Sequence, residues 1–152
     1  MIIRDMTLQD RENFLAMVRD FYDSGAALHG FREEIPEKNL NAFLSGNPYL
    51  RCLMLESSDG ITAGYALLSL SWTTEYGGPL VILEELYLCP DMRGRGLAGA
   101  FFRWLFTQYD TDAAAYRLEV APGNAQVMDI YRKYGYETLE YIQMIKTEPL
   151  KK

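Results

Sequence analysis

The segment from Arg93 to Ala100, RGRGLAGA, combines three glycines with two arginines. Glycine has no side chain, so the backbone N–H groups of such a segment can approach a ligand closely. Apolar periodicity from Leu97 onward predicts a helix, whose free N–H groups and dipole favour an anion at this end. Arg93 and Arg95 can add charge-assisted hydrogen bonds. These residues together indicate binding of a phosphate or pyrophosphate.

Two other interpretations of this segment are weaker. Glycines can serve a tight turn, but three glycines and two arginines exceed what a turn needs. Gly94, Gly96 and Gly99 also match the dinucleotide-binding pattern G-x-G-x-x-G, with an acid, Glu119, downstream. In that pattern the glycines follow the strand closely, whereas residues 89–93 intervene here. Glu119 also lies inside its predicted strand, and the chain lacks room for two mononucleotide-binding halves.

Covalent and metal chemistry are not expected. Cys52 and Cys89 each lie in an apolar run, as small buried hydrophobic residues do. The one histidine, His29, is in a distant loop segment, and a cysteine without an activating base is a poor nucleophile. No cluster of His, Asp or Glu indicates a metal site, so we expect none.

Hydrophobic periodicity predicts the elements that must position the glycine-rich segment. Thr7 can cap a first helix that ends near Ser24, with Asp10 as a weaker capping-box acid. A second helix starts at Pro36, a third at about Leu97, and a fourth covers residues 127–134, closed by Gly135. Strands are predicted at Ile2–Arg4, Cys52–Glu56, Ile61–Trp72, Leu80–Leu88, Tyr116–Val120 and Tyr136–Lys146.

This order of elements predicts a mixed α/β sheet. Hairpins in the first half imply antiparallel pairing, and the strand–helix–strand unit from Leu80 to Val120 implies a right-handed parallel crossover. Helices are therefore expected on both faces of the sheet.

The glycine-rich segment, together with its surroundings, resembles the GNAT acetyltransferases. Arg93-x-x-Gly96-x-Ala98 is similar to the R/Q-x-x-G-x-G/A pyrophosphate loop of that family. The preceding residues 84–90, EELYLCP, resemble the family's fourth strand and its proline turn. Asn124 and the run 131–136, YRKYGY, resemble a second signature, an asparagine followed by Tyr-x-x-x-Gly-aromatic. The likeness is strong over residues 80–136, whereas the first half matches only in the order of elements.

The resemblance implies the GNAT acyl-CoA N-acyltransferase fold, a central mixed β-sheet flanked by about four helices, in a single domain over residues 1–152. It also implies acetyl-CoA as co-substrate. In this family the fourth and fifth strands splay apart, and the pantetheine arm lies between them like an added strand. The residues expected to contact the cofactor are Leu86, Tyr87, Leu88, Arg93, Gly94, Arg95, Gly96, Leu97, Ala98, Gly99, Asn124 and Tyr131.

The activity implied is direct acetyl transfer to a primary amine. An alkyl ammonium has a pKa of ~10.4, so a base must remove its proton at neutral pH. Glu84 and Glu85 are adjacent and are expected to point to opposite faces of their strand. By register against spermidine/spermine acetyltransferases, Glu84 is the expected base, directly or through water. Glu85 as the base, or two ordinary strand-face carboxylates, are the alternatives.

Tyr131 matches the tyrosine that often reprotonates the coenzyme A thiolate in this family. A tyrosine with a pKa of ~10 is protonated at neutral pH and can act as that acid. Packing in the core is its other interpretation, and both can hold because tyrosine buries its ring and keeps a polar tip.

The acceptor is the least determined part of the site. The family resemblance places the first helices and the hairpin before the fourth strand on the acceptor side, where aromatic rings and carboxylates can receive a cation. This favours a polyamine, a lysine side chain or another small amine; a solvated acidic loop is the alternative. The expected acceptor-binding residues are Tyr22, Trp72, Glu75, Tyr76 and Glu85.

The whole chain agrees with a small enzyme. Its net charge of −6 argues against nucleic acid as a partner. The N-terminus lacks the apolar core of a signal peptide, and no apolar run reaches the ~20 residues that cross a bilayer, so we expect a cytoplasmic protein without a membrane partner. A homodimer through the C-terminal strand region is expected by resemblance. The rival functions are a non-catalytic acyl-CoA-binding sensor module and a nucleotide-dependent redox protein.

Overall fold

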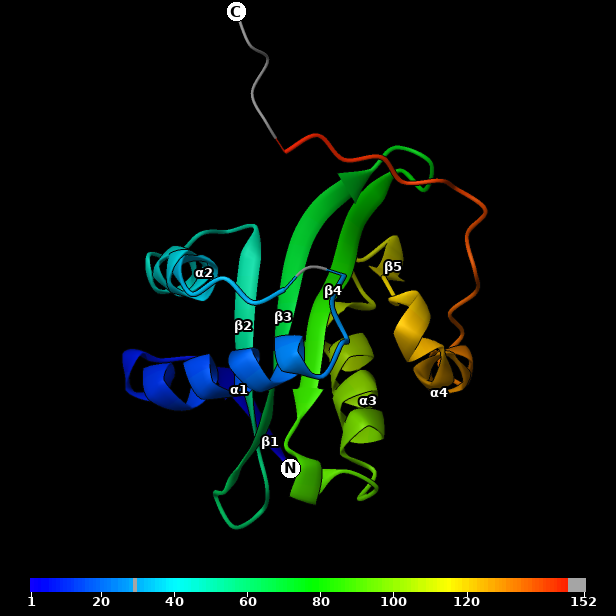
Figure 1. The fold of residues 1–152 in the computed structure, drawn as a ribbon. Coiled ribbons are helices and arrows are strands. Elements are labelled where there is room, and N and C mark those ends of the chain that lie inside the picture. The colour runs from blue at the N-terminus through cyan, green and yellow to red at the C-terminus, as the bar shows by residue number, and fades with distance from the viewer. Residues whose placement is uncertain (29, 148–152) are drawn as a thin grey trace, which may run out of the picture.

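A five-stranded sheet forms the centre of the computed structural model, which describes residues 1–28 and 30–147. His29 therefore lies outside the described residues. The strands lie in the order β1-β2-β3-β4-β5 along the sheet (Figure 1). Their bounds are β1 Ile2–Asp5, β2 Leu50–Glu56, β3 Thr62–Thr73, β4 Gly78–Leu88 and β5 Ala115–Leu118.

The sheet is mixed, as the order of elements predicts. Strands β1 to β4 pair antiparallel with their neighbours, and β4 pairs parallel with β5. The turn between β2 and β3 closes through a hydrogen bond from the Gly60 N–H to the Ser57 carbonyl, with Gly60 at a φ of 76° that favours glycine. The parallel pair needs a crossover, which the helix after β4 supplies.

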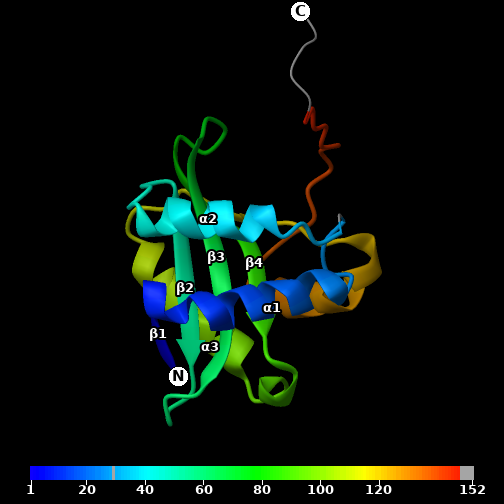
Figure 2. The same ribbon diagram turned by 60° about the vertical axis from the view of Figure 1, so that its left-hand side comes forward.

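Four α-helices cover the two faces of the sheet. Helices α1 (Arg11–Asp23) and α2 (Glu34–Leu44) lie across β2, β3 and β4 on one face (Figure 2), and α3 (Leu97–Tyr109) lies on the other. The short α4 (Met128–Arg132) packs on the α3 side through Tyr131 and Tyr134. Each face has its own core, centred on Phe14 and Tyr65 towards α1 and on Phe101 and Phe102 towards α3. None of the helices in the described ranges is long and apolar enough to cross a membrane.

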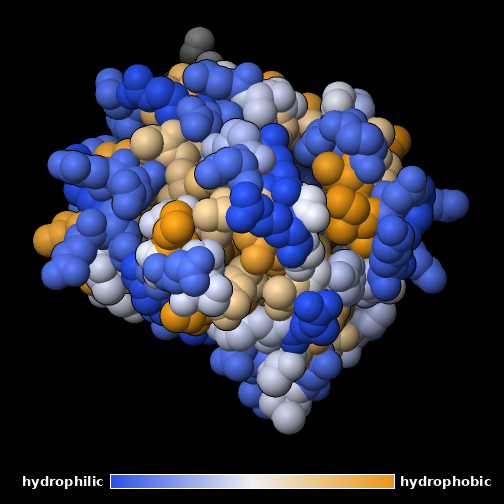
Figure 3. Space-filling model, turned by 90° about the horizontal axis from the view of Figure 1, so that it is seen from below, coloured by the Kyte–Doolittle hydropathy of each residue, from blue (hydrophilic) through white to orange (hydrophobic). Residues whose placement is uncertain are grey.

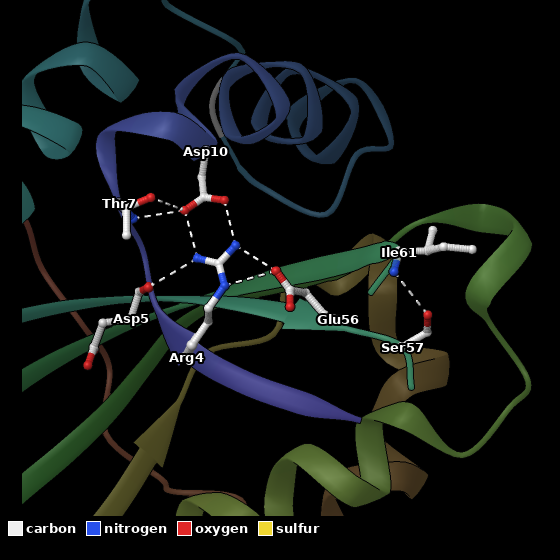
Figure 4. A network of polar contacts seen from close by, with 7 residues as sticks. All are labelled: Arg4, Asp5, Thr7, Asp10, Glu56, Ser57 and Ile61. Carbon is white, nitrogen blue, oxygen red and sulfur yellow. Dashed lines mark hydrogen bonds and ion pairs between the residues drawn. The ribbon is translucent and has the colours of Figure 1, made fainter. Parts of the chain in front are cut away.

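An ion-pair network fixes the start of α1 against β1 and β2 (Figure 4). The Arg4 guanidinium donates to both carboxylate oxygens of Asp10, at 2.7 and 2.8 Å, and its Nε donates to Glu56 at 2.9 Å. The Thr7 N–H also donates to Asp10, at 2.8 Å, so the predicted capping acid is confirmed. Its hydrogen bond from Arg4 lowers the pKa of Asp10 to about 2.

The predicted closing strand at Tyr136–Lys146 is wrong for the described structure. Residues 137–147 form no strand and run away from the body as an arm (Figure 1). A strand needs a hydrogen-bonding edge, but the arm contacts the tip of the β3–β4 hairpin, where the Tyr141 hydroxyl donates to Glu75. The arm consequently exposes its apolar side chains; Ile142 and Met144 are 91% and 95% exposed.

Candidate active site

A cleft opens where β5 separates from β4. Their pairing ends at Leu83 and Leu118, whereas β4 continues to Leu88. Residues from four parts of the chain line this cleft, so side chains that are distant in sequence lie close together there. Its lining includes Phe21, Ala26, Glu84, Glu85, Leu86, Glu119, Asn124, Val127 and Tyr131.

A β-bulge in β4 lies at the mouth of this cleft. Leu68 of β3 pairs with Leu83 and Leu67 pairs with Glu85, so Glu84 is an extra residue without a partner on β3. The expectation that Glu84 and Glu85 point to opposite faces is therefore wrong. The bulge interrupts the alternation of side chains, and both carboxylates bond to groups on the α1 side of the sheet.

Glu85 is the more buried member of the pair. The Tyr65 hydroxyl donates to Oε2 at 2.7 Å, and the Tyr22 hydroxyl of α1 donates to Oε1 at 3.2 Å. Burial raises the pKa of Glu85 above its ordinary value, and the two hydrogen bonds oppose that shift only in part. A carboxylate with a raised pKa beside a cleft is typical of functional sites.

Glu84 is the exposed member of the pair. The Ser69 hydroxyl donates to its Oε1. Ser69 follows Tyr65 and Leu67 in the alternation of β3, and both of those side chains belong to the core under α1. Glu84 can therefore meet a solute on the α1 side while it lines the cleft.

Tyr131 lines the same cleft as the two carboxylates. Its half-buried ring packs edge-to-face on Phe102, with 5.8 Å between ring centroids, and burial raises the pKa of its hydroxyl. The hydroxyl accordingly remains protonated at neutral pH, as a proton donor requires. Asn124 lines the cleft beside it and accepts a hydrogen bond from Gln126 at 2.9 Å.

The loop before α3 has the geometry of an anion site. Gly94 and Gly96 adopt φ values of 72° and 76°, and a Cβ built on either meets no atom within 4 Å. The first N–H groups of α3 follow directly at Leu97, so the residues present fit a pyrophosphate. Gly99 has a different local role, because a Cβ there would lie 2.5 Å from the Tyr134 hydroxyl. This end of the molecule exposes hydrophobic residues between hydrophilic ones (Figure 3).

Arg93 and Tyr87 are held by protein contacts. The Arg93 Nε donates to the Leu88 carbonyl at 3.0 Å, and the guanidinium lies 5.8 Å from the centroid of the Tyr87 ring. The Tyr87 ring stacks on Tyr65 at 5.7 Å, and its hydroxyl donates to Asp20 at 3.2 Å. The side chain of Tyr87 thus belongs to the core towards α1, whereas Arg95 is exposed.

Three of the expected acceptor-binding residues do not reach the cleft. Trp72 and Tyr76 are 65% and 63% exposed near the tip of the β3–β4 hairpin, and Glu75 accepts the hydroxyl of Tyr141. The hairpin extends from the Leu68–Leu83 pair to Thr73 and Gly78, which carries its tip away from the bulge. Tyr22 is the expected aromatic residue that does reach the carboxylate pair.

Two contacting residues, Tyr65 and Ser69, were not anticipated. Each donates a hydrogen bond to one of the paired carboxylates. Period-2 alternation places both on one face of their strand, and pairing β3 against β4 as a hairpin would have brought them opposite Glu84 and Glu85.

Comparisons with known proteins find relatives over most of the chain. The sequence pattern described as "Acetyltransferase (GNAT) family" matches residues 14–136. Thialysine N-epsilon-acetyltransferase of Mus musculus is 25% identical over 146 residues, covering 90% of this chain and 84% of that protein. The protein of the same name from Bos taurus is 27% identical over 147 residues, covering 91% of this chain and 85% of that protein.

Solved structures share the fold. A possible acetyltransferase from Clostridium difficile 630 superposes with a TM-score of 0.81 at 15% identity, covering 99% of this chain and 98% of that one. Aminoglycoside N-acetyltransferase AAC(6')-Iy, in complex with CoA, gives a TM-score of 0.72 at 19% identity, covering 97% of this chain and 95% of that one.

Proposed function

Since this chain belongs to the acetyltransferase (GNAT) family and is an N-acetyltransferase, we propose that it transfers acetyl from acetyl-CoA directly to a primary amine. The observation that carries this proposal is the cleft that Glu84, Glu85 and Tyr131 line together, because it offers a base and an acid to one bound pair of substrates. Thialysine, named for the relatives, is a lysine-like amino acid, and the acceptor proposed here is of that kind: a small amine, a polyamine or a lysine-type side chain.

Acetyl-CoA would be held by backbone groups. N–H groups of the Gly94–Gly99 loop and of the first turn of α3 would bind the pyrophosphate, and Arg95 can add a charge-assisted hydrogen bond. Past Leu83 the edge of β4 is free of β5, so backbone groups of Leu86 and Leu88 can bind the pantetheine arm as an added strand. Tyr87 would contribute its backbone alone.

Glu84 would act as the base. It is exposed at the mouth of the cleft, where an ammonium group can approach it, and the hydrogen bond from Ser69 fixes its carboxylate. Glu85 lies beside it on the same face and adds negative charge, which favours binding of the cation. The proton of the acceptor passes to Glu84 directly or through a water molecule.

Tyr131 would return a proton to the sulfur of coenzyme A as the new amide forms. It lines the same cleft as the carboxylates, so a base and an acid can act on one pair of bound substrates. Asn124, which also lines the cleft, can bind the cofactor arm.

A homodimer would cover the C-terminal arm. Leu139, Tyr141, Ile142, Met144 and Ile145 are each more than half exposed, and a second copy of the chain can bury them. The outer edge of β5 has no strand partner among the described residues and could receive such an arm.

The test measures coenzyme A release with a panel of amines, after a thermal-shift comparison of acetyl-CoA, coenzyme A and NADH. Acetyl-CoA at one hundred times its Kd should add ~2.7 kcal/mol to the free energy of unfolding.

Glu84→Gln should lower kcat/KM ~100-fold at neutral pH. At high pH, where more of the amine is unprotonated, kcat/KM of this variant should recover in part. Tyr131→Phe should keep the acetyl-CoA shift and lower kcat.

Glu75→Gln, which removes a carboxylate at the hairpin tip, is the matched control and should leave the kinetics unchanged. A pH profile of Glu84→Gln that parallels the parent would remove Glu84 from the role of base. Stabilisation by NADH without any response to coenzyme A would contradict the proposed cofactor.

A further inference from the structure

Arg117 of β5 shares a face of the sheet with the carboxylate pair. Its neighbours Tyr116 and Leu118 pack against the core on the α3 side. Since side chains alternate along a strand, Arg117 points to the other face, the one to which Glu84 and Glu85 also bond. In Figure 1, α1 and α2 do not reach β5, so these two helices leave this part of the sheet face uncovered.

The guanidinium of Arg117 lacks a partner in the part of the chain that the structure describes. Its Nε is buried and has no hydrogen-bond acceptor, and no ion pair involves Arg117 within residues 1–28 and 30–147. A buried polar atom without a partner is costly, although Arg117 as a whole is only half-buried. An anion that binds here from solution would remove this cost.

The register places Arg117 at a useful distance from the base. Arg117 pairs with Ile82, two residues before Glu84 on β4. With strands ~4.8 Å apart and ~3.3 Å per residue, the Cα atoms of Arg117 and Glu84 are ~8 Å apart. Side chains that rise from one face of the sheet at this spacing can hold an amine and an anion at the two ends of a short aliphatic chain.

We propose that Arg117 binds the carboxylate of the acceptor, which makes the preferred acceptor an amino acid with a side-chain amine. Guanidinium and carboxylate fit each other through two parallel hydrogen bonds, which fixes the orientation of the acceptor as well as its affinity. The inference rests on the proposed function and narrows it, because a polyamine has no group for Arg117.

The experiment compares acceptors that differ only at the carboxylate. L-lysine and L-thialysine carry it, lysinamide replaces it with a neutral amide, and cadaverine is lysine without it. In the unchanged protein, KM should be about 10-fold or more lower for lysine than for lysinamide or cadaverine. Arg117→Gln should raise the KM for lysine and for thialysine by about the same 10-fold. The KM for cadaverine should change less than about 2-fold. Arg117→Lys should recover part of the loss, because it keeps the charge but not the paired hydrogen bonds.

Arg11→Gln is the matched control, since it removes an arginine whose ion pair with Glu37 ties α1 to α2. Arg11→Gln should change the KM of all acceptors by the same factor or leave it unchanged. Equal KM values for lysine and lysinamide in the unchanged protein would overturn the inference even if the Gln variant does not fold. An equal increase in KM for lysine and for cadaverine in Arg117→Gln would overturn it as well. If none of the amines is acetylated although acetyl-CoA binds, the proposed function itself fails.

Discussion

Two adjacent glutamates differ in almost every physical respect at the scale of single residues. Glu84 is exposed and bonds to one serine, whereas Glu85 is largely buried and bonds to two tyrosines. Burial favours the neutral form of a carboxyl group, and hydrogen bonds from hydroxyls favour the charged form. Burial is the larger effect at Glu85, so its pKa is raised. In the mechanism proposed above, Glu84 accepts the proton and Glu85 supplies the neighbouring charge.

The raised pKa of Glu85 predicts how stability changes with pH. The folded protein holds this proton more tightly than the unfolded chain, so the contribution to stability is complete below the ordinary pKa of glutamate. It is lost as pH rises through the raised pKa. Relative to the parent, Glu85→Gln should therefore gain stability between pH 4 and neutral pH, measured by urea unfolding at each pH. Glu140→Gln, on the exposed arm, should show the same dependence of unfolding free energy on pH as the parent. If Glu85→Gln also shows that dependence, Glu85 does not have the raised pKa.

At the scale of elements, the close contact between β3 and β4 supports the site. A Cβ on Gly64 would lie 2.0 Å from the Tyr87 carbonyl oxygen, so a side chain there pushes the two strands apart next to the cleft. Gly64→Ala should lower the free energy of unfolding by ~1–3 kcal/mol, as overpacking does. Gly123→Ala meets no atom within 4 Å and should stay within ~0.5 kcal/mol of the parent in the same urea titration. Equal stability of the two variants would contradict this role of Gly64.

Most elements could be predicted because their local signals agree with the final contacts. Apolar periodicity found the four helices and five of the six predicted strands, and Thr7 with Asp10 found the start of the first helix. The closing strand failed because alternation records a tendency to pair but does not specify which edge, or which copy of the chain, supplies the partner. Regular alternation predicts opposite faces for Glu84 and Glu85. The bulge inserts one residue into the strand, and no residue type in the sequence marks it. The resemblance alone placed Trp72 and Tyr76 on the acceptor side, and it does not show that the tip of the hairpin lies away from the bulge.

On the scale of the whole molecule, the exposed arm predicts self-association. Residues 137–147 place several apolar side chains in solvent, which a free monomer rarely does. Sedimentation should give about twice the 17.4 kDa chain mass, and Ile142→Lys with Ile145→Lys should shift the protein towards the monomer. Glu137→Lys changes the charge of the same arm without touching an apolar residue and should leave the dimer intact. A parent protein that sediments as a monomer at all concentrations would rule out this use of the arm.

The bulge in β4 also bears on how this enzyme can change over generations. Glu84 is the residue that β3 does not pair, so its removal leaves Leu83 next to Glu85, with each still opposite its present partner. Side chains before and after the gap keep their faces, and the two cores keep their composition. A three-nucleotide deletion could therefore erase the proposed base while sparing the fold, and an insertion could restore it. Chemistry placed on an unpaired residue can be gained and lost faster than the scaffold that carries it.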